Sequence, residues 1–588
     1  MNFRSVIRSL VRPQYIVVLV YVVMIIASWR RWTTLIVDSG REMDLPHRLL
    51  NGEMLYRDVH YLYTPFTPYF NAFLYRIFGV HLDTLIASGI VFSTLLVFLC
   101  YRIFRRLAPP METAIATSFV VVLCVFKPSG NLIFPYSFAA LHGAVFCLAT
   151  VLFTIRYAES RKRIELIIAG IFIGLATITK NEFAFAAALT VTVYLIFLHR
   201  KEIRAFAADL AYAAVPALLI AVPVFAILFA NIDWQILVND CHLFYTNIPE
   251  SVVLYNNFRS GFDHPLASLF QMAGAAALGS AFVVLIVFCS DVTGTLRKKS
   301  VCVFVISAGI ATAILSLSIK QWDGSPLRAL PFFLIGMILI EWRRKTANGA
   351  LFVLAVYSLA ILFRVILRVP SGGFSGGFYL PTSIALIFYA LLWELPLAVK
   401  SWTTDERSFI RARRITQSIC VVTILATAFS FGFRYRKRFS YEIAAPRGTT
   451  VVENDTGPVI DATLKFIEAN TAVDETIAVL PEGNDLAFLT GRRIDLRYET
   501  LDPGFLSQQG ELDAIAALKR DNVRYIFILN RPMTEFGATA FGRDFYQSFG
   551  NWIEENYEVV EVFGVPTGQR PEIGEGPFFI KVYKRKGL

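Results

Sequence analysis

The sequence is poor in charged residues. Asp, Glu, Lys and Arg make up 17% of the 588 residues, whereas 55% of the residues are hydrophobic. A soluble globular protein carries about 25% charged residues, and the shortfall lies in the first three quarters of the chain. The composition therefore excludes a protein that is soluble over its whole length. It predicts an α-helical polytopic membrane domain over residues 1–440 and a soluble α/β domain over residues 446–588.

Several motifs are also missing. The soluble region contains no cysteine, and the seven cysteines of the chain lie in or beside apolar segments except for Cys241 in a predicted loop, so neither a disulfide framework nor a zinc pattern is indicated. The soluble region has no GxGxxG, GxxxxGK[ST], HExxH or CxxC motif. The chain has no Asp-x-Asp pair, the usual metal-nucleotide clamp of cytosolic sugar-nucleotide enzymes. No cofactor and no metal ligands are assigned, although the dependence on a divalent metal stays open.

The net charge of +11 does not indicate a nucleic-acid partner, because Lys and Arg occur in short clusters between apolar runs. Such clusters orient a chain in a bilayer.

Several apolar intervals between the clusters are each too long for one membrane crossing and suit two, namely 107–155, 164–199, 205–296, 300–342 and 346–399. With a first helix at 14–36, read as a retained anchor, and a last at 415–433, about thirteen helices are predicted. We expect a multi-pass protein of the inner (plasma) membrane, with a cytoplasmic N-terminus and a periplasmic or extracytoplasmic C-terminal domain.

Two exterior segments are too long to be turns, at residues 37–82 and 231–265. The first has apolar residues at helical spacing with tyrosines between them, which predicts two short helices lying apolar side down on the outer membrane surface. After residue 446, helices are expected at 457–470, 508–521 and 544–556. Strands are expected at 475–480, 523–529, 558–564 and 577–584.

The first candidate catalytic residue is Asp38, which follows the first helix at the outer interface. An acid at that depth is costly unless it is used or solvated. Ser39 and Glu42 fit a capping box, so a structural role for Glu42 is the simpler interpretation, and a helix-capping role for Asp38 is the alternative to a reactive one. Glu42 and Asp44 are secondary candidates.

Cations at the outer face are candidates for binding a lipid phosphate. Lys180 and Glu182 lie in the Thr179–Glu182 interruption of the 164–199 interval, where the chain must fold back in an exposed turn. Other exterior cations are Arg57, Lys127, Arg259, Lys320, Arg328, Arg364 and Arg368. We select Lys180, Arg57, Lys320 and Arg328 as donor-binding candidates, with Glu182, His264 and Tyr63 as further secondary candidates.

The first exterior loop, from Asp38 through LLNGEMLYRDVHYLYTPFTPYFNAFLYRIFG, the later TKNE turn and the C-terminal exterior domain carry a resemblance. Together they resemble the membrane glycosyltransferases of the C superfamily (GT-C), in particular bacterial relatives of protein O-mannosyltransferases and of the lipid A aminoarabinose transferase. The resemblance implies a sugar donor on a polyprenyl phosphate and a catalytic Asp38. Some relatives carry an acid in the next exterior loop, but this chain reads KPSGNLIFPYS there.

The chemistry of such a transfer can be matched to the residues. A base must take the proton of the acceptor hydroxyl, and cations must stabilise the departing phosphate. A phosphate leaves without protonation by a second acid, so Asp38 suffices, and inversion at the anomeric carbon is expected. The acceptor, a glycan, lipid or protein, is left open. The alternatives are a transporter or flippase of lipid-linked glycans, whose site would lie at the membrane midplane, and a non-catalytic scaffold.

Overall fold

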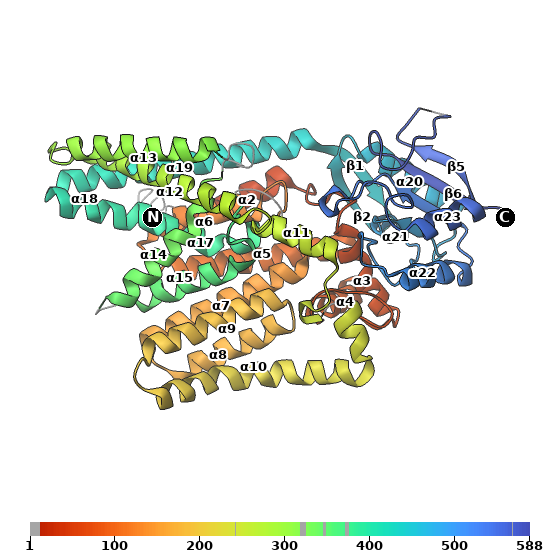
Figure 1. Ribbon diagram of the computed structural model, residues 1–588, viewed down its shortest axis with the longest axis horizontal. Coiled ribbons are helices and arrows are strands. Elements are labelled where there is room, and N and C mark those ends of the chain that lie inside the picture. Colours follow the sequence, from red (N-terminus) through yellow and green to blue (C-terminus); the bar gives the residue numbers. More distant parts are fainter. Residues whose placement is uncertain are drawn as a thin grey trace, which may run out of the picture.

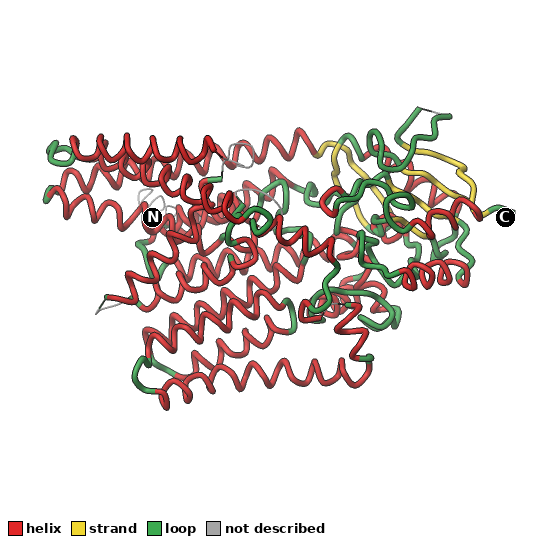
Figure 2. Tube along the Cα trace, viewed as in Figure 1, coloured by secondary structure: helices red, strands yellow, loops and turns green. Residues whose placement is uncertain are grey.

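The computed structural model describes residues 12–241, 243–317, 325–344, 348–370, 376–566 and 568–587. An elongated bundle of helices carries a domain with strands at one end (Figures 1 and 2). The helices of the bundle are α2 (Pro13–Ser28), α5 (Leu82–Phe104), α6 (Pro110–Val120), α7 (Phe138–Ser160), α8 (Arg163–Thr177), α9 (Asn181–Leu198), α10 (Ile203–Asn231), α12 (Pro265–Ser290), α13 (Arg297–Leu317), α14 (Leu330–Arg343), α15 (Gly349–Ile361), α17 (Pro381–Tyr389), α18 (Leu395–Thr403) and α19 (Glu406–Arg438).

Each predicted apolar interval holds at least two helices, as the predicted hairpins require. Seven stretches of the described residues are long and apolar enough to cross a membrane: Leu82–Phe104, Phe138–Ser160, Asn181–Leu198, Ile203–Asn231, Glu250–Ser290, Pro381–Thr403 and Glu406–Arg438. Pro13–Ser28, Pro110–Val125 and Gly349–Ile361 are shorter apolar helices. The chain is thus a multi-pass membrane protein with the predicted helical fold class, while the number of crossings stays a prediction.

The first helix is shorter than expected. It ends at Ser28 rather than near residue 36, so Asp38 does not terminate it. Arg30 lies two residues beyond the end of the helix and has a left-handed φ of 57°. Its carbonyl accepts the Val451 N–H at 2.8 Å, and its guanidinium donates to the Thr449 carbonyl at 3.1 Å. The segment after α2 is therefore not helical and is hydrogen-bonded to the strand Gly448–Glu453, which contains Thr449 and Val451.

The two short helices of the first exterior loop are α3 (Ser39–Leu50) and α4 (Phe66–Phe78). The expected surface position suits α4, which leaves Phe73, Ile77 and Phe78 exposed. It is wrong for α3, which is buried from Ser39 to Arg48 except for Arg41. Both helices lie between the bundle and the C-terminal domain in Figure 1, and that domain covers α3. The polar side chains of α3 therefore find partners in protein and not in headgroups.

The C-terminal region has the predicted α/β character. Its elements are β1 (Phe439–Ala445), β2 (Gly448–Glu453), α20 (Gly457–Asn470), β3 (Ala478–Leu480), α21 (Asp485–Thr490), α22 (Gln508–Arg520), β4 (Tyr525–Leu529), α23 (Gln547–Asn556), β5 (Tyr557–Phe563) and β6 (Ile580–Arg585). One sheet has the order β3-β4-β6-β5, in which only β3 and β4 run parallel. The β1–β2 hairpin was not predicted, and it continues directly from α19.

Candidate active site

A cavity of ≈ 490 Å³ lies where the bundle meets the C-terminal domain. Its walls come from the first exterior loop, from α11 (Glu250–Ser260) in the second exterior loop, from the turn Phe363–Val365 and from loops of the C-terminal domain. The lining side chains that bear charge are Asp38, Arg41, Arg259, Arg364, Glu482, Asp502, Arg531 and Glu535. Tyr63, Tyr136, Tyr245, Tyr255, Phe258, Phe505 and Phe536 supply aromatic surface. The cavity thus combines acids, guanidinium groups and aromatic rings.

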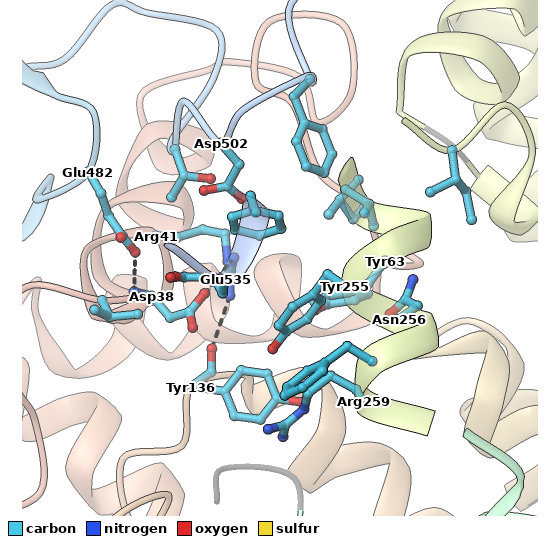
Figure 3. Close-up of a pocket in the computed structure, with 18 of the residues that line it drawn as sticks. Asp38, Arg41, Tyr63, Tyr136, Tyr255, Asn256, Arg259, Glu482, Asp502 and Glu535 are labelled. Carbon is cyan, nitrogen blue, oxygen red and sulfur yellow. Dashed lines mark hydrogen bonds and ion pairs between the residues drawn. The ribbon is translucent and has the colours of Figure 1, made fainter. Parts of the chain in front are cut away.

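Asp38 stands immediately before α3 with a left-handed φ of 61°. Its carboxylate is 3.1 Å from the Arg41 guanidinium, and the side chain keeps 29% of its surface exposed. Arg41 also donates to the Tyr136 carbonyl at 3.0 Å, which anchors it from the opposite side (Figure 3). The carboxylate is therefore oriented by a fixed cation and still faces the cavity.

Two acids of the C-terminal domain approach Asp38. Glu482 follows β3 and accepts the Asp38 backbone N–H through Oε1 at 2.6 Å. Arg531 follows β4, and its Nε lies 3.5 Å from Glu482 Oε2. Burial is the main cause that raises the pKa of Glu482 well above its ordinary value, and the negative charge of Asp38 is the second. The same two causes raise the pKa of Asp502 to about 7. Ligand sites form at the carboxyl ends of adjacent parallel strands in many α/β domains.

The other side of the cavity is cationic. In Figure 3, Glu482 and Asp502 lie at the top, Asp38 lies at mid-height, and Tyr136 and Arg259 lie at the bottom. Arg364 also lines the cavity and lies 3.4 Å from Asn256 in α11, the helix that carries Arg259. It keeps 37% of its side chain exposed and pairs with Glu182 at 3.2 Å. The end of the cavity at the C-terminal domain thus combines carboxylates with Arg41 and Arg531, whereas the end at the bundle, called the guanidinium end here, carries Arg259 and Arg364.

Behind the cationic end lies a buried cluster around Glu182. Glu182 accepts from the hydroxyls of Tyr379 at 2.5 Å and Tyr245 at 3.0 Å, and lies 3.3 Å from Lys180 Nζ. The Lys180 ammonium also lies 4.3 Å from the centre of the Tyr63 ring. The TKNE turn between α8 and α9 is confirmed, but its expected exposure is wrong, because Lys180 is fully buried by these partners.

Among the described residues, no group of three or more His, Cys, Asp or Glu side chains is arranged to hold a metal ion. The carboxylates of the cavity instead have cations or backbone N–H groups beside them.

The capping box predicted for Ser39 and Glu42 is not formed. Glu42 Oε2 accepts the Phe138 N–H at 3.1 Å, so Glu42 fastens α3 to α7 and does not cap its own helix.

Comparison with known proteins bears on this arrangement. The family model described as dolichyl-phosphate-mannose-protein mannosyltransferase matches residues 63–227. No curated protein matches the sequence. The oligosaccharyltransferase of Archaeoglobus fulgidus, solved in complex with Zn and sulfate, is similar in structure with a TM-score of 0.50 and 12% identity, over 88% of this chain and 68% of that one.

This oligosaccharyltransferase is a GT-C membrane glycosyltransferase, and the chain shares its fold. A second solved structure, ArnT from Cupriavidus metallidurans bound to undecaprenyl phosphate, matches 96% of this chain and 97% of its own at 14% identity and a TM-score of 0.42. The GT-C resemblance predicted from the sequence is confirmed, and the family match together with the shared fold supports a membrane glycosyltransferase.

Within this GT-C fold, only some of the predicted site residues meet. Asp38 and Tyr63 line the cavity, and Lys180 and Glu182 lie behind its cationic end. Arg57 is exposed and pairs with Asp58, Arg328 is buried against Gln271, and His264 is exposed at the start of α12. Asp44 is buried 3.9 Å from His47. Lys320 lies outside the described residues.

The sequence reasoning missed the site residues of the C-terminal domain, namely Glu482, Asp502, Arg531 and Glu535, and also Arg41. A signal was available for two of them. Glu482 and Arg531 each lie two residues after a predicted strand, and the ends of neighbouring parallel strands lie together. The other three follow no such pattern in the sequence.

Glu42 predicts a pH dependence of stability. Burial raises its pKa to about 7, although Arg41 and the Phe138 N–H act in the opposite direction. Between the ordinary glutamate pKa of about 4.3 and this value, the folded state binds a proton that the unfolded state has lost. The contribution of Glu42 to the free energy of unfolding is therefore fully present below that range and is lost as the pH rises to about 7.

The measurement compares wild type with Glu42→Gln, whose amide cannot ionise. From pH 4.5 to 7.5, wild type should lose about 3 kcal/mol of unfolding free energy relative to the variant, as denaturation in detergent would report. A constant difference between the two proteins across this range would contradict the assignment.

Proposed function

We propose that this protein is an inverting glycosyltransferase that moves a sugar from a polyprenyl-phosphate donor to an acceptor hydroxyl at the outer membrane face. The observation that carries the proposal is one cavity that holds the Asp38 carboxylate together with the guanidinium groups of Arg259 and Arg364. The family match, to a group named for a lipid-phosphate-linked mannose donor, supports the same class of donor.

Each end of the cavity suits one reactant. The guanidinium end adjoins the bundle, and therefore the bilayer, so it suits the phosphate of a lipid whose chain stays in the membrane. Asp38 suits the role of general base, because its partly exposed carboxylate can accept the proton of the attacking hydroxyl. As the phosphate leaves, Arg259 and Arg364 would balance its growing negative charge.

The positions of the basic turns support an outer-face site. The turns that carry Arg161, Arg200 and Lys400 are at the end of the bundle opposite to the C-terminal domain (Figure 1). Because basic turns favour the cytoplasmic side, the cavity and the C-terminal domain are assigned to the extracytoplasmic side. This orientation agrees with the one expected from the sequence.

The donor class can be tested directly. Mass spectrometry of lipid that co-purifies with the full chain should detect a polyprenyl monophosphate sugar, which would also identify the sugar. Incubation with this lipid and candidate glycan, lipid or protein acceptors should then yield a product of inverted anomeric configuration. Transfer from a soluble nucleotide sugar alone would overturn the proposal.

The cations give a second prediction. Arg259→Gln and Arg364→Gln should each raise the KM for the lipid donor about 10- to 100-fold, because a hydrogen bond to a charged group is worth about 1.5–3 kcal/mol. The matched control is Arg57→Gln, an exposed arginine outside the cavity, which should change the KM less than about twofold. Equal effects of all three substitutions would argue against a phosphate site at this end.

A further inference from the structure

One segment of the C-terminal domain, residues 482–485, lies against the start of α3. It contacts Asp38 through the hydrogen bond from the Asp38 N–H to Glu482 Oε1. Asp38 is in the left-handed region, which costs an L-residue roughly 1–2 kcal/mol unless its surroundings hold it there. The bond of 2.6 Å between the Asp38 nitrogen and the Glu482 carboxyl oxygen is short for a backbone N–H donor, so it can hold the turn in this conformation.

Gly40 makes the second contact with this segment. A Cβ at Gly40 would lie 2.6 Å from the backbone nitrogen of Asp485 and 2.8 Å from that of Asn484. No side chain fits into this space, so the two backbones touch directly. Two separate contacts within three residues of the chain therefore connect the Asp38 turn to the C-terminal domain.

The segment is itself held in place. Asn484 donates to Glu499 Oε2 at 2.6 Å, and Glu499 Oε1 lies 3.0 Å from the guanidinium of Arg48 in α3. Arg48 is buried and also pairs with Glu53 at 2.6 Å. The chain of contacts thus returns to α3 about three turns beyond Asp38, so that α3 and the segment are fixed relative to each other at both ends.

We propose that Glu482 is a positioning residue, which holds the Asp38 turn in its left-handed conformation. Through this residue the C-terminal domain orients the carboxylate of Asp38 in the active site. This inference rests on the proposed function, in which Asp38 is the base. Without the bond, the turn can relax, and the carboxylate moves relative to the acceptor hydroxyl. A displacement of about 1 Å at a reacting group can cost about 100-fold in rate.

The test compares Glu482→Ala with Glu482→Gln in the full chain. Gln keeps an oxygen that accepts the Asp38 N–H, whereas Ala removes it. Glu482→Ala should lower kcat for transfer about 10- to 100-fold with less than about threefold change in the donor KM, and Gln should restore kcat to within about threefold of wild type. Equal losses of kcat in both variants would overturn the positioning role, because they would point to the charge instead.

A readout without catalysis separates this inference from the proposed function. Hydrogen exchange of a peptide covering residues 36–43 should be faster in Glu482→Ala and unchanged in Glu482→Gln. Glu535→Ala is the control for loss of a negative charge in the same cavity, since Glu535 pairs with Arg531 and should leave this exchange rate unchanged. Unchanged exchange in Glu482→Ala would overturn the inference even where Asp38 proves essential for transfer. Faster exchange with Asp38 proving dispensable would instead overturn the proposed function.

Gly40→Ala provides an independent variant at the second contact. Its added methyl group must push the 482–485 segment away, so exchange in the same peptide should rise and kcat should fall, as in Glu482→Ala. Wild-type exchange and wild-type kcat in Gly40→Ala would contradict the direct contact between the backbones.

Discussion

Asp38→Asn is expected to reduce transfer by about 10³-fold while the protein still inserts and binds its lipid donor. Removal of a general base costs about 10²–10⁴-fold in rate. Asn has nearly the same shape, tolerates the left-handed conformation and keeps the backbone N–H that Glu482 accepts. The substitution therefore removes the proton acceptor with little change in the structure around it.

The measurement is the rate of sugar transfer in detergent or vesicles, together with the amount of co-purifying lipid. Asp83→Asn is the matched control, because Asp83 pairs with Arg30 outside the cavity and keeps 45% of its side chain exposed. Transfer by Asp38→Asn within tenfold of wild type would refute the role of Asp38 as base. Transbilayer movement of lipid-linked sugar that survives the substitution, with no transfer by wild type, would favour a flippase.

Lys180→Met is expected to destabilise the folded protein by about 3 kcal/mol or more. Removal of one member of a buried ion pair leaves the other charge without its counterion, which costs about 3–5 kcal/mol. Glu182 would keep Arg364, Tyr245 and Tyr379 as partners. For this reason, the lower end of the range is expected.

Thermal unfolding in detergent should therefore show a lower Tm for Lys180→Met. The control is Lys201→Met, an exposed lysine in the turn between α9 and α10, which should leave the Tm unchanged. The sequence alone suggested that Lys180 binds the donor phosphate. An unchanged Tm with a large rise in donor KM would favour that first interpretation over a structural role.

The C-terminal domain forms part of the wall of the candidate active site, which the sequence did not indicate. The absence of GxGxxG, GxxxxGK[ST], HExxH and CxxC motifs gave no sign that this domain takes part in the chemistry. Its loops in fact supply four charged residues to the cavity wall and the bond to the Asp38 backbone. An acceptor that enters from the outside would pass these loops before it reaches Asp38.

The sequence by itself determined the membrane character, the helical hairpins, the fold-back at the TKNE turn and the GT-C resemblance. The first three depend on local composition and periodicity, which decide whether a segment can satisfy its backbone in lipid. The resemblance rests instead on the first exterior loop, the TKNE turn and the C-terminal domain. Asp38 was also predicted from local sequence, because an acid next to an apolar segment is costly wherever the chain folds.

Only the tertiary structure decided which charges meet. Asp38 and Glu482 are separated by 444 residues in the chain, and no periodic pattern records a contact at that distance. The burial of α3 and of Lys180 has the same origin. Their polar side chains look solvated in the sequence, but the docked C-terminal domain and the rings of Tyr63 and Tyr136 exclude the water. Docking of distant surfaces depends on their three-dimensional fit, which short-range sequence patterns do not encode.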